Sequence, residues 1–299
     1  MSRHLGILAT TAAYFIWGAS PLFWTRLQRI PALELLGWRV LFALLILSAA
    51  IIIRGRAGAL RQALADPRTL IIASLSSGCL MINWLLFVWS VTHGHIVDVS
   101  LGYYINPLMS VALGVLVLGE SLRLGTRLAV GLAVLGVGVI TFAVGHLPTI
   151  PLLLAASFAF YGLLKKQRGA APPTEALAIE SALAMVPLGG YLGNLVLRGE
   201  SVALTTPQDW VWLPFTGLIT VAPLLLFGVA AQRTRLSTIG MLQFIAPSLQ
   251  LIIGVLIYAE AVDPSEKIGF GLVWIAILLF AADMYQADSA SRRELKSES

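Results

Sequence analysis

Charged residues and cysteines are scarce in this sequence, and their scarcity excludes whole classes of protein. Asp, Glu, Lys and Arg make up 12% of the 299 residues, against about 25% in ordinary soluble domains. The apolar share reaches 58%, which is more than a soluble protein of this length can shield from water. The single cysteine, Cys79, rules out a disulfide framework. A two-domain soluble enzyme is therefore excluded, and a polytopic membrane protein is favoured.

The sequence also lacks the short motifs of several enzyme classes. It contains no G-x-x-x-x-G-K-[ST] phosphate loop, no H-E-x-x-H zinc motif, no G-x-S-x-G elbow and no dinucleotide fingerprint. We therefore expect no P-loop ATPase domain, no catalytic residues and no cofactor. His93, His95 and Asp98 cluster near one predicted loop, but no cysteine or further ligand accompanies them, so we expect a solvated loop and no metal.

Long apolar runs, by contrast, fill most of the sequence. A helix needs about 20 apolar residues to cross a bilayer core about 30 Å thick. The runs do not alternate with polar residues, so we expect helices and not the strands of a membrane barrel. The first run is too long for the core of a signal peptide, so we expect it to be retained. Ten segments approach the required length: 5–24, 33–53, 69–92, 97–118, 125–144, 148–164, 175–197, 210–231, 237–258 and 267–286.

An internal repeat is the strongest sign of organisation. The matching residues are Pro107, Gly114 and Glu120 with Pro247, Gly254 and Glu260, Leu85–Phe87 with Leu225–Phe227, Tyr14–Gly18 with Phe158–Gly162, and Glu34 and Arg39 with Glu175 and Glu180. Five helices per half is an odd number, so the second half must enter the membrane from the opposite side. We therefore predict two inverted five-helix repeats, residues 1–145 and 148–288, and a cytoplasmic tail at 289–299.

Lysine and arginine are distributed unevenly between the predicted loops. Fifteen of the twenty lie on one side of the expected spans, Arg39 lies inside a span, and the other side holds Arg26, Arg29, Arg198 and Lys267. Since cytoplasmic loops carry the excess of these residues, both termini are expected in the cytoplasm. The net charge of +5 then reflects orientation in a lipid bilayer, and we expect no nucleic-acid partner.

Polar and aromatic side chains inside the predicted spans are the candidate functional residues, because polar groups are costly in lipid. The amides fall near the middle of their spans, where hydrogen bonding between helices explains them equally well. The aromatic rings lie inside helices as well as at headgroup level, and such walls suit an amphipathic organic solute. Eight residues are predicted to line a substrate cavity: Tyr14, Trp17, Asn83, Trp84, Tyr103, Asn106, Tyr161 and Gln243.

Two prolines and two charged residues complete the predicted site. Pro107 and Pro247 each release a backbone carbonyl near the midplane, and we predict that these repeat-related residues act as hinges. Arg39 lies about six residues into the second span, where a side chain that snorkels to the headgroups is an equal alternative. Glu180 lies comparably deep in the seventh span, but from the other side. Inverted symmetry places the two at opposite mouths, so we predict two separate gates and no Arg39–Glu180 pair.

Six short motifs, spread along nearly the whole chain, carry a family resemblance. They are Ala13-Tyr14-Phe15-Ile16-Trp17-Gly18, Asn83-Trp84-Leu85-Leu86-Phe87, Ser100-Leu101-Gly102-Tyr103-Tyr104-Ile105-Asn106-Pro107-Leu108, Leu118-Gly119-Glu120, Phe158-Ala159-Phe160-Tyr161-Gly162 and Arg235-Leu236-Ser237-Thr238. The sequence thus resembles the RarD branch of the EamA-type drug/metabolite transporter superfamily. The stretch 240–244 departs from the more aromatic sequence of this branch.

The resemblance implies a ten-helix inverted repeat in a bacterial inner membrane and the export or permeation of small metabolites. Relatives in the superfamily include exporters of amino acids, aromatic ones among them. We predict a secondary transporter or facilitator of small amphipathic metabolites, above all amino acids, that works by alternating access around a midplane cavity. A chloramphenicol-type drug exporter is the alternative within transport, and an intramembrane enzyme or sensor subunit is the alternative outside it. The sequence leaves the oligomeric state open.

Acidic residues of the predicted spans lie mostly near span ends, where water is expected to reach them. Glu34, Glu120 and Glu175 follow this pattern, and Glu180 is the one exception. A proton-coupled carrier usually places a carboxylate deep in its pathway. Because the residues predicted at the midplane are neutral, we expect transport to proceed without a proton gradient.

Single-cysteine labelling from outside the cell tests the predicted orientation. We expect label on cysteines placed near residues 30, 95, 146, 200 and 263, because these loops lie on the side that is poor in lysine and arginine. Cysteines at either terminus should stay unlabelled until the membrane is permeabilised. External labelling of a C-terminal cysteine would reverse the orientation and the side of each gate.

Overall fold

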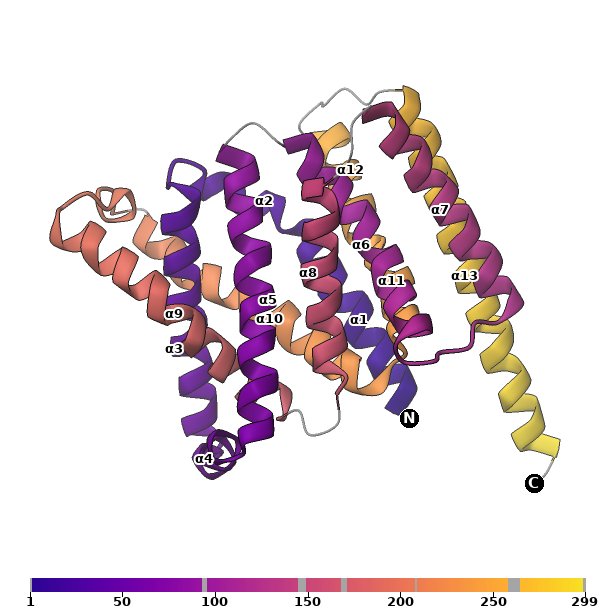
Figure 1. Cartoon of the computed structure of the whole chain (residues 1–299), viewed down its shortest axis with the longest axis horizontal. Helices are drawn as coiled ribbons and strands as arrows, with labels where there is room; N and C mark the ends of the chain where they lie inside the picture. Colours follow the sequence, from indigo (N-terminus) through magenta and orange to yellow (C-terminus); the bar gives the residue numbers. More distant parts are fainter. Residues whose placement is uncertain are drawn as a thin grey trace.

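The computed structural model describes residues 2–92, 96–144, 149–167, 171–207, 209–257 and 264–297. Within these ranges all regular secondary structure is helical. The helices stand side by side in one bundle, and both chain ends lie at the same end of it (Figure 1). The expectation of an all-helical polytopic membrane protein is confirmed.

The helices follow the predicted runs closely. The first half holds α1 (Ser2–Ala19), α2 (Pro21–Trp24), the 3-10 turn η1 (Thr25–Leu27), α3 (Ala32–Ile53), α4 (Ala57–Ala65), α5 (Pro67–Thr92), α6 (Ile96–Leu116) and α7 (Leu124–Val144). The second half holds α8 (Thr149–Lys165), α9 (Pro173–Leu197), the 3-10 turn η2 (Val202–Leu204), α10 (Asp209–Arg233), α11 (Leu236–Gln243), α12 (Ile245–Ile257) and α13 (Pro264–Ser297).

Each of the ten expected spans coincides with helical structure, with three differences of detail. The ninth is divided into α11 and α12, the short helix α4 was not expected, and α13 continues into the segment expected as a tail. In the described part of the chain, eight helices are long and apolar enough to cross a membrane, and two further apolar helices, Leu101–Leu116 and Thr149–Lys165, are shorter. The count of ten crossings stays a prediction.

Helices α3 and α9 begin and end in the same way. Pro31 and Pro172 occupy their N-cap positions with extended ψ angles of 136° and 147°. Proline has no backbone N–H to donate, so it suits the start of a helix. Gly55 and Gly199 follow the C-caps with φ angles of 62° and 69°, a left-handed conformation that favours glycine. Proline and glycine therefore delimit both apolar runs, and the two helices pack against each other.

Other helix pairs join the two halves. Helix α6 packs against α11, and α7 packs against α13 along one edge of the bundle (Figure 1). The second contact is close, because a Cβ built on Gly136 would lie 2.8 Å from the carbonyl oxygen of Gly269, and one built on Gly269 would lie 2.8 Å from that of Gly136. Helix α1 packs on α10 and α12, while α8 packs on α5 and α6.

The surface of the bundle is strongly apolar. Large side chains such as Phe142 and Leu197 are 88% and 89% exposed. A soluble monomer rarely exposes apolar patches on this scale, whereas lipid tails accept them. The largest buried apolar cluster surrounds Tyr14, Tyr161 and Phe227, and it joins α1 and α3 to α8, α9 and α10.

Gly217 of α10 provides a test of this packing. A Cβ at this position would lie 2.6 Å from the carbonyl carbon of Phe42 in α3, so Gly217→Ala should force the helices apart and destabilise the protein by about 1–3 kcal/mol. The matched control is Gly131→Ala in α7, where a Cβ meets nothing within 4 Å. We expect a lower thermal unfolding midpoint in detergent for Gly217→Ala alone. Equal midpoints for the two variants would contradict the close α3–α10 contact.

Candidate functional site

A small cavity lies between α3, α5, α9 and α10. Its volume is about 10 Å³, which is roughly the space for one water molecule. The helices around it therefore adopt a closed arrangement that admits no larger solute. The lining residues are Val40, Ala43, Ser77, Leu80, Trp84, Leu177, Glu180, Ser181, Ala184, Thr220, Val221 and Leu224.

A buried ion pair borders this cavity. Lys165 Nζ lies 2.5 Å from Glu180 Oε1, and the two side chains are 6% and 2% exposed. The Tyr161 hydroxyl donates to Glu180 Oε2 at 3.4 Å, and Ser77 Oγ donates to the Glu180 carbonyl oxygen at 2.9 Å. Residues of α5, α8 and α9 therefore meet at Glu180.

Lys165 is a site residue that sequence reasoning missed, because it was counted among the loop charges. It is the last residue of α8, and its side chain turns inward to Glu180. The available signal was its spacing from Tyr161, since residues four apart lie on one face of a helix. Its Nζ indeed lies 5.2 Å from the centre of the Tyr161 ring.

Several predicted cavity residues form an aromatic cluster instead of lining the cavity. Tyr14 and Trp17 of α1 have ring centres 5.2 Å apart, and Trp17 meets Phe158 of α8 at 5.7 Å. Tyr161 stacks on Phe227 of α10 at 5.7 Å. This cluster shares a buried core with the apolar cavity residues Leu80, Leu177, Val221 and Leu224. The aromatic rings therefore lie behind one wall of the cavity.

The predicted amides are engaged with neighbouring helices. Asn83 Nδ2 donates to the Leu154 carbonyl oxygen at 2.9 Å and to Ser157 Oγ at 3.0 Å, which joins α5 to α8. Asn106 Oδ1 accepts from Ser110 Oγ at 3.5 Å. Gln243 lies beside Tyr14, and its Oε1 is buried without a hydrogen bond in the described structure.

The two predicted hinge prolines differ in their effect on the helices. Pro107 lies inside α6, which continues through it, and a Cβ built on Gly240 would lie 2.6 Å from the Pro107 carbonyl oxygen. Pro247 is the third residue of α12, just after the break at Phe244 that separates α11 from α12. A pivot at either proline stays a prediction.

Trp84 and Glu180 are the predicted residues that line the cavity. Arg39 lies near Trp84, with its guanidinium carbon 4.9 Å from the ring centre, while Glu180 pairs with Lys165. Tyr103 is 41% exposed and does not line the cavity.

The expectation that water reaches the acidic residues near span ends is wrong for Glu34. Its side chain is 1% exposed. Ser201 Oγ donates to Glu34 Oε1 at 2.6 Å, and the backbone N–H groups of Val202 and Ala203 donate to its two oxygens at 3.1 Å. These donors belong to the start of η2, so Glu34 caps a helical turn from the other half of the chain.

Glu120 and Glu175 are also held by distant segments. Glu120 accepts from the backbone N–H groups of Leu236 and Ser237 at 2.7 and 2.9 Å, so it caps the N-terminus of α11. Glu175 is fully buried, and its Oε1 lies 2.8 Å from Arg56 Nε. These partners could not be predicted, because they lie far away along the chain. Glu260, His93, His95 and the side chain of Asp98 lie outside the described residues.

The bundle and its closed central cavity define a polytopic membrane protein, and comparison with known proteins gives its family. Residues 4–142 and 149–282 each match the EamA-like transporter family. "Protein RarD" of Streptomyces exfoliatus is 41% identical over 99% of this chain and 94% of its own length. An "Uncharacterized transporter" of Vibrio cholerae is 39% identical, over 96% of this chain and 95% of its own.

The chain belongs to the EamA-like transporter family, and the resemblance to its RarD branch is confirmed. It is a membrane transporter. One solved structure, described as "Crystal structure of protein", has a TM-score of 0.70 at 17% identity and covers 93% of this chain and 97% of its own. At that identity the likeness shows the fold alone.

The Lys165–Glu180 pair can be tested by paired substitutions. Glu180→Gln alone leaves a buried lysine without its counter-charge, so we expect a loss of about 3–5 kcal/mol in unfolding free energy. Lys165→Met together with Glu180→Gln removes both charges and should recover much of that loss. Arg123→Gln is the control, because the Arg123–Asp283 pair is 3.6 Å apart with Arg123 56% exposed, and such pairs contribute about 0–1 kcal/mol. Additive losses in thermal unfolding would contradict a coupled pair.

Proposed function

We propose that this protein is a secondary transporter or facilitator of small amphipathic metabolites, aromatic amino acids foremost. The observation that carries the proposal is the composition of the cavity wall, since α3 and α5 come from one half of the chain and α9 and α10 from the other. Secondary transporters built from repeats bind substrate near the midplane between their halves. The aromatic cluster behind the wall suits a solute with a ring.

The proposal includes two inverted repeats, residues 1–145 and 148–288. Two separate matches to the same family, at 4–142 and 149–282, support it. So does the packing of α3 on α9, α6 on α11 and α7 on α13, because repeat-equivalent helices meet at a pseudo-two-fold axis. Pro31 and Pro172 occupy the N-cap positions of equivalent helices, and the buried acids Glu34 and Glu175 lie in the first turns of these helices.

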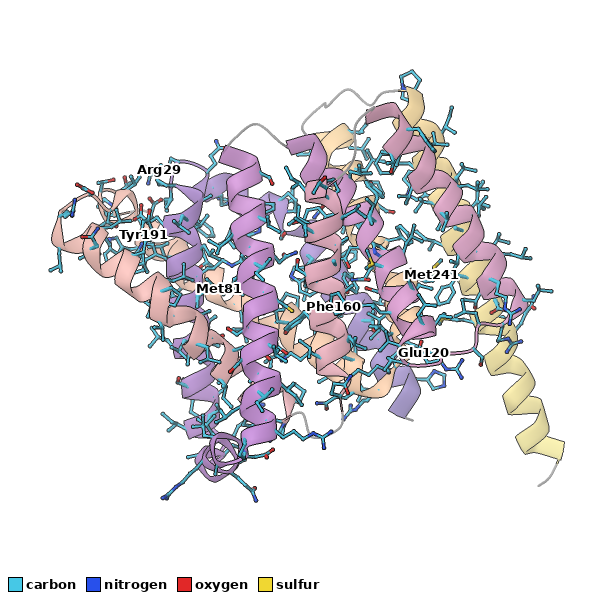
Figure 2. The ribbon with its side chains drawn as sticks, viewed as in Figure 1. Arg29, Met81, Glu120, Phe160, Tyr191 and Met241 are labelled. Carbon is cyan, nitrogen blue, oxygen red and sulfur yellow. The ribbon has the colours of Figure 1, made fainter. Side chains whose placement is uncertain are left out.

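Contacts that charged side chains make between the halves lie at the two ends of the bundle. At the end opposite the termini, here called the outer end, Ser201 binds Glu34, and Arg29 pairs with Asp209 at 2.5 Å. At the end that holds the termini, the inner end, Arg56 pairs with Glu175. Figure 2 shows Arg29 near the outer end and Glu120 toward the inner end.

This arrangement supports alternating access. Glu34 binds the segment after α9, and Glu175 binds the segment after α3, so equivalent acids hold opposite ends closed. Opening one end requires its own set of contacts to separate while the other set keeps the halves together. We place the inner end in the cytoplasm of a bacterial inner membrane, in accord with the lysine and arginine distribution.

Glu180 and Lys165 form the inner boundary of the cavity in this scheme. Both belong to the second half, so their ion pair can move as a unit. Ser77 of the first half donates to the Glu180 carbonyl oxygen, and this bond must break when the inner end opens. Because the buried carboxylate already has a counter-charge, we retain the proposal of transport without proton coupling. Arg39 is the corresponding candidate at the outer side.

Uptake of labelled phenylalanine by liposomes that contain the purified protein tests the proposed function. We expect uptake down a concentration gradient without a proton gradient, and at least several-fold slower uptake for Trp84→Ala, because Trp84 forms part of the cavity wall. Trp274→Ala is the matched control, since Trp274 lies on α13 and is 40% exposed. Folded yield should match the wild type for both.

Two results would overturn parts of the proposal. Absence of uptake for phenylalanine and for other amphipathic metabolites, with uptake of chloramphenicol, would favour the drug exporter. Uptake that strictly requires an imposed proton gradient, and that the Lys165→Met, Glu180→Gln double variant abolishes, would make Glu180 the coupling site.

A further inference from the structure

Arg39 is a membrane-embedded cation without a counter-charge in the described part of the chain. It is the eighth residue of α3, about 10 Å from the helix start at 1.5 Å per residue. The buried carboxylates of the described bundle have partners: Glu180 has Lys165, Glu175 has Arg56, Asp209 has Arg29, and Glu34 accepts hydrogen bonds from the start of η2. Arg39 forms no such ion pair with a described residue, and its Nε is buried without a hydrogen bond.

The guanidinium group of Arg39 lies over the rings of two tryptophans. Its carbon lies 4.9 Å from the ring centre of Trp84 and 5.6 Å from that of Trp24. Contacts with the ring faces stabilise the cation but use none of its five N–H donors, which point outward in the guanidinium plane. Of these donors, the Nε–H is buried and has no hydrogen-bond acceptor among the described residues.

Arg39 lies next to residues that line the cavity. Trp84 lines the cavity, and so does Val40, the next residue along α3. Glu180 lies on the same wall, but its charge is matched by Lys165. A solute that enters the cavity therefore meets one unmatched charge, the cation beside Trp84, next to an aromatic surface.

We propose that Arg39 binds the carboxylate of the transported solute. A carboxylate matches the planar fork of a guanidinium group with two parallel hydrogen bonds, and its arrival supplies the missing counter-charge in a region of low dielectric constant. The inference rests on the proposed function and adds to it a substrate class, organic carboxylates with an apolar or aromatic side group. An amine or a neutral drug of the same shape lacks the group that Arg39 recognises.

Binding to the purified full-length protein in detergent tests this site without any transport step. The probes are phenylalanine, phenylacetate and phenylethylamine, which differ in the carboxylate and the ammonium group. We expect phenylalanine and phenylacetate to raise the unfolding temperature and phenylethylamine to leave it unchanged. Arg39→Gln should weaken carboxylate binding by about tenfold or more, and Arg39→Lys by less.

Arg26→Gln is the matched control for this experiment. Arg26 also lies over a tryptophan, 4.7 Å from the ring centre of Trp212, but Arg26 is exposed, and Trp212, unlike Trp84, does not line the cavity. This variant should bind carboxylates as the wild type does. Arg39→Gln without ligand should unfold no earlier than the wild type, since it removes an unpaired charge, whereas a purely structural arginine would lower the unfolding temperature when replaced.

The outcomes separate this proposal from the proposed function. Equal binding of phenylethylamine and phenylacetate, or unchanged carboxylate binding in Arg39→Gln, overturns the carboxylate site even where liposomes take up phenylalanine. The site is also overturned if Arg39→Gln weakens carboxylate binding only when the protein is in phosphatidylglycerol vesicles and not in detergent. In that case Arg39 binds a lipid headgroup. Arg39-dependent binding of phenylacetate supports the site. If liposomes then take up no amphipathic solute, it is the transport proposal that fails.

Discussion

The structure depends on keeping charge paired in a medium that cannot solvate it. Several carboxylates of the bundle are bound by groups that lie far away along the chain: Glu34 by the start of η2, Glu175 by Arg56, and Glu120 by the start of α11. An isolated charge in lipid costs several kcal/mol. These contacts therefore fix the positions of distant segments relative to one another, which non-directional apolar packing alone does not do. They also place the contacts of charged side chains between the halves at the ends, while the amide of Asn83 joins α5 to α8 nearer the middle.

Most of the fold could be predicted because a membrane-spanning helix is indicated by the length of its apolar run and by the prolines and glycines that bound it. The predicted span 33–53 became Ala32–Ile53 and 175–197 became Pro173–Leu197, because Pro31, Pro172, Gly55 and Gly199 bound the apolar runs. The break in the ninth span was visible as Pro247, which cannot donate to the carbonyl of Gln243. Pro107 produces no such break in α6, because tertiary packing decides whether a proline bends or interrupts a helix.

The site was harder to predict, for reasons that particular residues make plain. Trp84 and Glu180 could be recognised from their depth alone, since both are unusual inside an apolar run. Lys165 could not, because a charged residue at a helix end resembles a loop residue until its side chain is seen to turn inward. Glu34 was expected to be hydrated, and its donors in the other half, Ser201, Val202 and Ala203, lie 167 to 169 residues away in sequence and left no local signal. The distance of a polar residue from the ends of its span identifies it as a candidate, whereas its partner depends on contacts between helices.

The size of the central cavity has a consequence for the electrical insulation of the membrane. With room for about one water molecule, this cavity is too small to hold a file of water molecules. Protons hop along such files, so a permeation pathway that stayed hydrated while idle would drain the proton gradient of the cell. The apolar contacts of Leu80, Val221 and Leu224 in this wall interrupt that route. A transporter closed in this way would keep the membrane insulated against protons while no solute moves.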